Sequence, residues 1–117
     1  MIQGTFGDDD ELFFEIELLA ADGLELPVDV LLDTGFSGWL AMNSQDLEGF
    51  DWSYIRHQTL QLAQGEAIFS LYGGKVRIDE QEFDIPVYAN TEVPEFLLGR
   101  KWLKTRRLVV DFPSGTN

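Results

Sequence analysis

Cysteine is absent from the 117 residues of this chain, which excludes a disulfide framework and any metal site built on thiolates. Basic residues are few, and the net charge of −13 argues against a nucleic-acid-binding surface. No apolar run has the length of a membrane span, and the first residues lack the basic and apolar blocks of a signal peptide. We therefore expect a cytoplasmic protein that contacts neither membrane nor nucleic acid.

Few side chains are available for metal or nucleophilic chemistry. The single histidine, His57, falls on an expected hairpin strand and fits a surface position better than a metal ligand, because metal sites need several ligands at suitable spacing. Ser37 and Ser44 remain available as nucleophiles, although the sequence has no Gly-x-Ser-x-Gly elbow. We expect no metal and no cofactor.

What is present is the composition of a globular chain, with 44% hydrophobic and 13% aromatic residues. The length fits one domain, which we place at residues 1–112, followed by a tail at 113–117. Alternating apolar and polar residues predict mostly strands. The expected strands are Met1–Phe6, Leu12–Leu19, Leu24–Leu32, Trp39–Met42, His57–Leu62, Ala67–Leu71, Gly73–Asp79, Glu82–Ala89 and Leu108–Phe112. Helical turns are expected from Asn43 or Ser44 to Leu47, and from Gly99 to about Arg106 or Arg107.

The most informative stretch runs from Val30 to Gly38. Three consecutive apolar residues read as a buried strand that delivers Asp33 directly into a Thr-Gly turn. A carboxylate at the inner end of a buried strand is costly unless it is used or paired. Gly35 permits a close approach of backbone that a Cβ would block. Asp33 is therefore the first candidate for a functional carboxylate.

This stretch resembles the Asp-Thr-Gly signature of retroviral-type (retropepsin-like) aspartic proteases. Ser37 follows the signature, and the downstream segment Phe96–Leu103 is similar to the apolar-apolar-Gly-Arg segment that leads into the helix of that family. The resemblance covers nearly the whole chain, and the bulky Phe36 is similar to bacterial single-domain members of clan AA. It implies an all-β, closed acid-protease barrel with one short C-terminal helix.

The resemblance also implies a mechanism. Only one Asp-Thr-Gly is present, so the second carboxylate would come from Asp33 of another copy in a homodimer. Two carboxylates a hydrogen bond apart can share one proton and supply both the base and the acid of peptide hydrolysis. Thr34 would brace the two active-site loops across the interface, and Gly35 would present backbone to an extended peptide or protein substrate.

Further site residues follow from the same resemblance. The expected substrate-binding residues are Phe36, Ser37, Ala63, Gln64, Gly65 and Leu98, of which the central three lie at the tip of a hairpin that matches the mobile flap. An ordinary surface hairpin would show the same pattern. Arg100 and Phe112 are expected at the interface, although the usual acidic partner of that arginine is not evident near Ser37.

Two other functions stay open from the sequence. The chain could be a catalytically idle dimerisation or peptide-binding module that kept the fold without turnover. It could also be an acidic scaffold that binds a partner through the basic residues between Arg100 and Arg107. The sequence favours the homodimeric aspartic endopeptidase.

Overall fold

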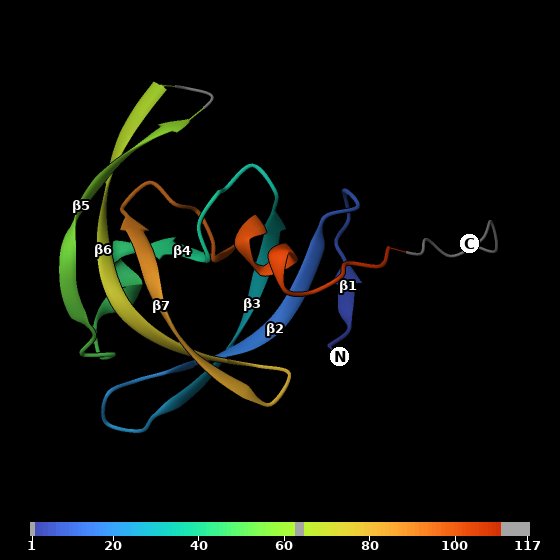
Figure 1. The fold of residues 1–117 in the computed structure, drawn as a ribbon, viewed down its shortest axis with the longest axis horizontal. Helices are drawn as coiled ribbons and strands as arrows, with labels where there is room; N and C mark the ends of the chain where they lie inside the picture. Colours follow the sequence, from blue (N-terminus) through green and yellow to red (C-terminus); the bar gives the residue numbers. More distant parts are fainter. Residues whose placement is uncertain (1, 63–64, 111–117) are drawn as a thin grey trace.

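A computed structural model describes residues 2–62 and 65–110 of the chain and shows one sheet of eight strands (Figure 1). The strands are β1 (Gly4–Phe6), β2 (Leu12–Leu19), β3 (Glu25–Asp33), β4 (Leu40–Asn43), β5 (Ser53–Leu62), β6 (Gly65–Ile78), β7 (Gln81–Asn90) and β8 (Leu97–Gly99). Two short 3₁₀ helices accompany them, η1 (Ser44–Leu47) and η2 (Arg100–Lys104). Within the described residues, no helix is long and apolar enough to cross a membrane.

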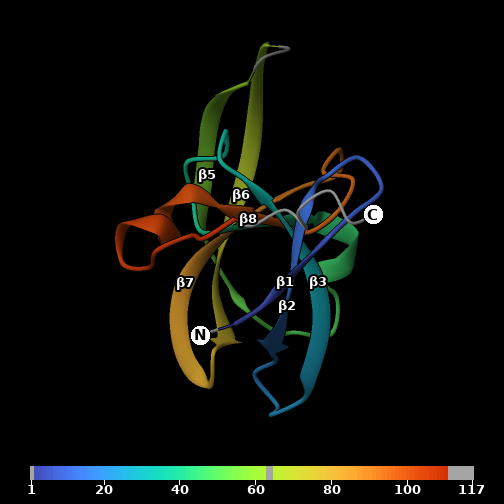
Figure 2. The same cartoon turned by 90° about the vertical axis from the view of Figure 1, so that its right-hand side faces the viewer.

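The sheet closes on itself into a barrel of six strands. Neighbouring strands follow the order β1-β2-β3-β8-β4-β7-β6-β5, and an additional pairing of β2 with β6 closes the ring. β1 and β5 therefore lie outside the ring (Figure 1), and Figure 2 shows the hairpin of β5 and β6 rising beyond the rest of the sheet. The prediction of an all-β closed barrel is confirmed.

The barrel interior is filled by the alternate residues of its strands. On β2 the alternate residues Ile16 and Leu18 are buried, as is Leu19 at the end of the strand, whereas Glu15 is exposed. Full burial of one such aliphatic side chain stabilises the fold by about 1.5–3 kcal/mol. The main cluster consists of Ile16, Leu18, Ala20, Val30, Leu40, Met42, Phe50, Val76, Ile78, Ile85, Val87, Leu98 and Trp102.

The long strand β6 differs from the sequence-based expectation, which divided it into Ala67–Leu71 and Gly73–Asp79. The chain continues as one strand through Tyr72. Gly74 lies inside this strand at a close contact with its neighbours. A Cβ there would lie 2.5 Å from Val87 Cγ2 and 3.1 Å from the ring of Trp52. This glycine allows close packing inside a strand and does not mark a boundary.

The C-terminal helix is shorter than expected. It is a 3₁₀ helix that ends at Lys104, where the amide of Thr105 donates to Trp102 O at 3.3 Å. The expected final strand is also wrong for residues 108–110, which are irregular and have no partner among the described strands. The rest of that predicted strand, including Phe112, lies outside the described residues.

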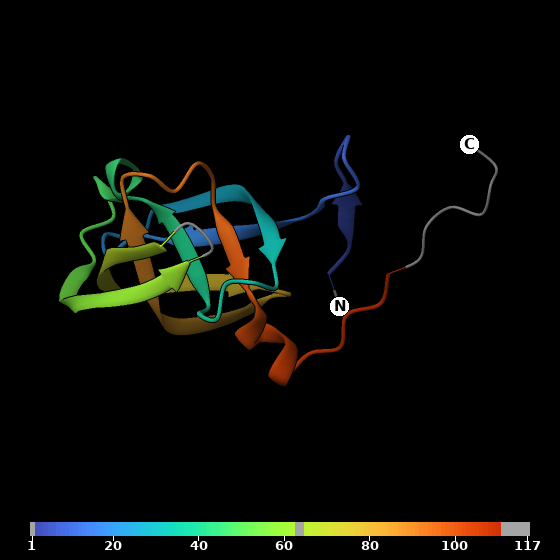
Figure 3. The same cartoon turned by 90° about the horizontal axis from the view of Figure 1, so that it is seen from above.

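Both ends of the described chain extend away from the barrel on the same side. β1 and the residues after η2 project together beyond the other strands in Figure 3. Phe6, Val109 and Val110 on these segments are large apolar residues that remain exposed. Exposed apolar groups of this size, gathered on one side, are typical of an interaction surface.

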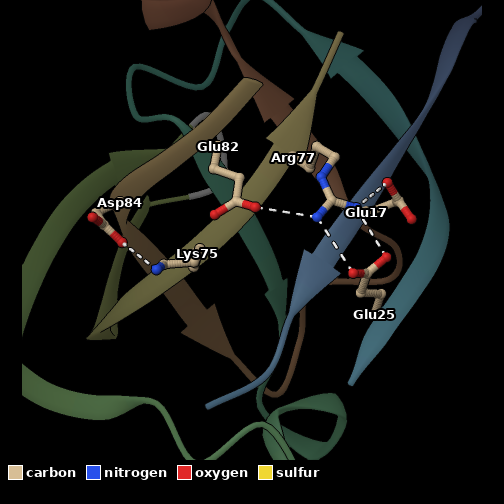
Figure 4. Close-up of polar contacts among 6 residues, drawn as sticks. All are labelled: Glu17, Glu25, Lys75, Arg77, Glu82 and Asp84. Carbon is tan, nitrogen blue, oxygen red and sulfur yellow. Dashed lines mark hydrogen bonds and ion pairs between the residues drawn. The ribbon is translucent and has the colours of Figure 1, made fainter. Parts of the chain in front are cut away.

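One arginine joins the strands where the barrel closes (Figure 4). Arg77 of β6 lies opposite Glu17 of β2 and Glu82 of β7, and it contacts their carboxylates at 3.0 and 3.1 Å. Glu25 of β3 accepts two further hydrogen bonds from it, at 2.9 and 3.3 Å. The hydrogen bonds from Arg77, and then its charge, hold the pKa of Glu25 below the ordinary value of 4.5.

A Glu25→Gln protein is expected to lose stability at neutral pH and to match the wild type in strong acid. A lowered folded-state pKa means that ionised Glu25 stabilises the fold above its unfolded pKa, and that this contribution is lost as pH falls through the folded pKa. Urea unfolding at several pH values measures the difference. Glu15→Gln on β2 removes an exposed carboxylate without an ion pair in the described part of the chain and should show no such pH dependence.

Candidate active site

Asp33 stands at the end of β3, where the buried part of that strand gives way to a turn. Val30 is fully buried, while Asp33 itself is only half-buried. β8 lies parallel to β3, with Leu31, Leu32 and Asp33 opposite Leu97, Leu98 and Gly99. The Leu-Leu-Asp and Leu-Leu-Gly segments are therefore direct neighbours in the sheet, and the carboxylate lies where both strands end.

The Thr-Gly turn orients the carboxylate. The amide of Phe36 donates to Asp33 O at 3.1 Å, which closes the turn. The amide of Gly35 donates to Asp33 Oδ1 at 2.9 Å and so fixes one carboxylate oxygen. A Cβ on Gly35 would lie 3.2 Å from the same oxygen, so glycine keeps the approach to the carboxylate open.

Backbone hydrogen bonds join this turn to the segment that leads from β8 into η2. The amides of Gly99 and Arg100 donate to Trp39 O at 2.9 Å and to Phe36 O at 3.0 Å. A Cβ on Gly99 would overlap the carbonyl oxygen of Gly38 and lie 2.6 Å from its carbonyl carbon. The two backbones therefore cross at a distance that only glycine permits.

Arg100 contacts the Asp-Thr-Gly turn within the same chain. Its Nη1 donates to Thr34 O at 3.3 Å, so the guanidinium interacts with a carbonyl in place of the acidic partner that the sequence lacked. Trp102 anchors the same helix, because its ring is buried against Trp39, at 4.6 Å between centroids, and its Nε1 donates to Trp39 O at 2.9 Å.

Phe36 connects the turn at Asp33 to the long hairpin formed by β5 and β6. Its ring is 8% exposed and meets Tyr88 edge-on, with centroids 5.4 Å apart. Tyr88 also contacts Phe69 of β6, at 6.1 Å between rings, and its hydroxyl donates to Gln58 Oε1 of β5 at 3.5 Å. A second apolar cluster thus joins the turn at Asp33 to both strands of the hairpin.

Two asparagines hold the loop between β7 and β8, and the sequence did not reveal this role. Asn43 caps η1 as expected, and its Nδ2 also donates to Thr91 O and to Val93 O at 3.0 Å each. Asn90 Nδ2 donates to Ile68 O of β6 at 2.9 Å. The loop is therefore fixed to the hairpin arm on one side and to β4 on the other.

Sequence comparison and structural comparison give different answers. No protein-family model and no curated protein matches the sequence. Solved structures do match, among them EIAV protease complexed with the inhibitor HBY-793, with a TM-score of 0.71 and 14% sequence identity. The match covers 91% of this chain and 99% of the protease chain. The fold is retropepsin-like.

The predicted site residues differ in how exposed they are on the retropepsin-like barrel. Thr34, Gly35 and Ser37 are exposed around Asp33, whereas Phe36 and Leu98 are buried and contribute to the core. Gly65 begins β6 with a positive φ of 125° at the end of the hairpin. Ala63, Gln64 and Phe112 lie outside the described residues.

Metal ligation finds no support in the described part of this retropepsin-like chain. No group of three or more His, Cys, Asp or Glu side chains lies close enough to hold an ion there. His57 Nδ1 instead lies 3.5 Å from Ser70 Oγ, and its ring contacts Tyr54 at 5.4 Å. What the site offers chemically is one turn-held carboxylate per chain.

Proposed function

We propose that the protein is an aspartic endopeptidase that works as a homodimer. The observation that carries the proposal is the position of Asp33, on an Asp-Thr-Gly turn at the end of β3 in a retropepsin-like barrel. One chain supplies one such carboxylate, and a two-fold axis beside the turn brings a second Asp33 to it. The similarity to EIAV protease supports this arrangement at the level of the fold.

Paired carboxylates provide both halves of peptide hydrolysis. When they are close, the two groups do not readily ionise together, so one holds a proton while the other is charged. The charged Asp33 takes a proton from water as the water oxygen bonds to the peptide carbonyl carbon, and the neutral Asp33 protonates the carbonyl oxygen. The carboxyl that took the proton from water then gives it to the leaving nitrogen, while the other carboxylate takes a proton from the gem-diol, and the carbon–nitrogen bond breaks to leave an amine and a carboxylic acid.

The remaining residues position substrate and partner. Thr34 and Arg100 hold the turn at the interface, and Gly35 leaves space for an extended peptide beside the carboxylate. The hairpin of β5 and β6 closes over the peptide and excludes water. Phe6, Val109 and Val110 provide apolar contacts between chains, which must offset the repulsion between two subunits that each carry a charge of −13.

Cleavage of an unstructured peptide library by the purified protein tests the proposal. Across about pH 4 to 7 we expect a bell-shaped profile, because the dyad needs one proton and not two. The rate per chain should rise with protein concentration until the dimer is saturated. Absence of cleavage at every pH, from a protein shown by sedimentation to be dimeric, would contradict the proposal and favour an idle peptide-binding module.

A further inference from the structure

The outer edge of β5 is a long strand edge without a neighbour. β5 comes last in the sheet order, and this ten-residue strand pairs with β6 alone (Figure 1). Among the described residues, no backbone group reaches the other side of β5. The edge strand at the opposite end of the sheet, β1, has only three residues. β5 therefore presents a row of unpaired amides and carbonyls that another strand could join.

The usual protections of such an edge are largely missing from β5. Short length, proline, lysine and inward-facing charges normally discourage strand addition. The segment Ser53–Leu62 contains no proline, lysine, aspartate or glutamate, although the chain has 21 acidic residues. Its protections are a bulge between Tyr54 and Arg56 and the charge of Arg56 itself.

Arg56 is a cation without a carboxylate partner in the described part of the chain. Lys75 faces Asp84 at 3.9 Å, and Arg77 contacts three glutamates. The recorded contact of Arg56 is with a neutral amide, since its Nη2 donates to Gln58 Oε1 at 3.1 Å. In a protein of charge −13, β5 is thus an acid-free edge with an available positive charge.

Apolar side chains lie beside this edge. Tyr54 and Ile55 on β5 are 50% and 48% exposed, and Ile68 on the paired strand is 65% exposed. Tyr54 is held by ring contacts with His57 and Tyr72, at 5.4 and 5.7 Å between centroids. A rigid, exposed aromatic group next to unpaired backbone provides contact area at low cost in conformational entropy.

We propose that the free edge of β5 docks an extended acidic segment of a partner protein, which adds a strand to the sheet. Backbone hydrogen bonds supply the affinity, a carboxylate pairs with Arg56, and apolar side chains pack on Tyr54 and Ile55. Arg56 also provides selectivity, because an uncharged strand would leave the guanidinium unpaired at the new interface. A second copy of this chain fits poorly through the same edge, since β5 contains no carboxylate that could pair with Arg56.

Two labelled peptides test the proposal. Each has about ten residues, alternating valine with either glutamate or lysine. Fluorescence anisotropy is measured with the wild type and with an Asp33→Asn protein, in which the proposed cleavage cannot remove the probe. We expect the glutamate peptide to bind at least about tenfold more tightly than the lysine peptide.

Variants of exposed cations then locate the binding. Arg56→Glu should reverse the peptide preference, and Arg56→Gln should abolish it. Lys104→Glu makes the same change of net charge on η2 and should leave the preference intact. Hydrogen exchange of the β5 amides should slow when the glutamate peptide binds.

Four results would overturn the proposal. The first is equal affinity for both peptides, and the second is an unchanged preference in Arg56→Glu. The third is protection at the turn around Asp33 in place of β5, which would assign the peptide to the active-site cleft. Protection of β5 that rises with protein concentration alone would identify a second copy as the occupant and also overturn it. None of these results depends on whether the protein cleaves peptides.

Discussion

An Asp33→Asn protein is expected to cleave no peptide at any pH at which the wild type is active. The substitution keeps the size of the side chain and its ability to accept from the amide of Gly35, so the turn should survive. It removes the group that takes a proton from water and the group that gives one back, in both chains. We expect the rate to fall by roughly 10⁴-fold, which leaves no product detectable by mass spectrometry.

Asp29→Asn is the matched control. Asp29 lies four residues earlier on β3, is exposed, and loses the same charge on substitution. It should retain wild-type cleavage, and both proteins should unfold at similar urea concentrations. Cleavage by Asp33→Asn at the wild-type rate would assign the activity to another site or to a contaminant.

Mixing the wild type with the Asp33→Asn protein tests whether the catalytic site is shared between two chains. With about ninefold excess of Asp33→Asn and free exchange of subunits, nearly every wild-type chain has an inactive partner. The activity per wild-type chain should then fall to about one tenth, because each functional dyad needs two intact carboxylates. Activity that stays proportional to the amount of wild-type chain would show that one chain forms a complete site.

A Gly99→Ala protein is expected to be largely unfolded or to lose more than about 3 kcal/mol of stability. The added Cβ would overlap the carbonyl oxygen of Gly38, and backbone cannot rotate away as the end of a long side chain can. Relief would require β8 to separate from the active-site turn and to break the bond from Gly99 N to Trp39 O. Urea unfolding followed by tryptophan fluorescence measures the loss, because Trp39 and Trp102 lie at this crossing.

Gly73→Ala provides the comparison within the same sheet. A Cβ at that position of β6 would meet nothing closer than 4.0 Å, and its backbone is not left-handed. The substitution should leave stability unchanged or raise it by about 0.5 kcal/mol, since alanine restricts the unfolded chain. Equal destabilisation by both substitutions would show that general strand propensity, and not the crossing with Gly38, decides the outcome.

Much of this fold could be predicted because its signals are local. The alternation in Leu12–Leu19 and the turn at Asp22-Gly23 predict one hairpin, and the structure pairs Leu19 with Glu25 around that turn. Asn43 or Ser44 was expected to begin the first helical turn, and Asn43 is the cap, since it accepts from Gln45 N at 2.9 Å. Asp33 was identified because a carboxylate after three apolar residues needs an explanation, and its location at a strand end beside β8 agrees with that reasoning.

What could not be predicted depends on contacts between distant residues. The sequence analysis separated two strands at Tyr72 where the structure has one, and nothing in the local sequence shows that Trp52 packs over Gly74 in the middle of β6. The early end of the C-terminal helix depends on how Trp102 is buried against Trp39. Asn43 reaches Thr91 and Val93 across 48 and 50 positions of sequence, and no short-range pattern encodes such hydrogen bonds.

The bond from Asn90 Nδ2 to Ile68 O bears on the proposed closure of the β5–β6 hairpin, because it ties β6 to the end of β7. A bend of β6 on the barrel side of Ile68 would break this bond and expose Phe69, which is buried with Phe36 and Tyr88. Those two losses cost about 1 kcal/mol for the hydrogen bond and about 1.5–3 kcal/mol for the ring. A bend on the tip side of Ile68 has neither cost, so in the proposed closure over substrate only the short segment beyond Ile68 would move, and the rest of the hairpin would stay with the barrel.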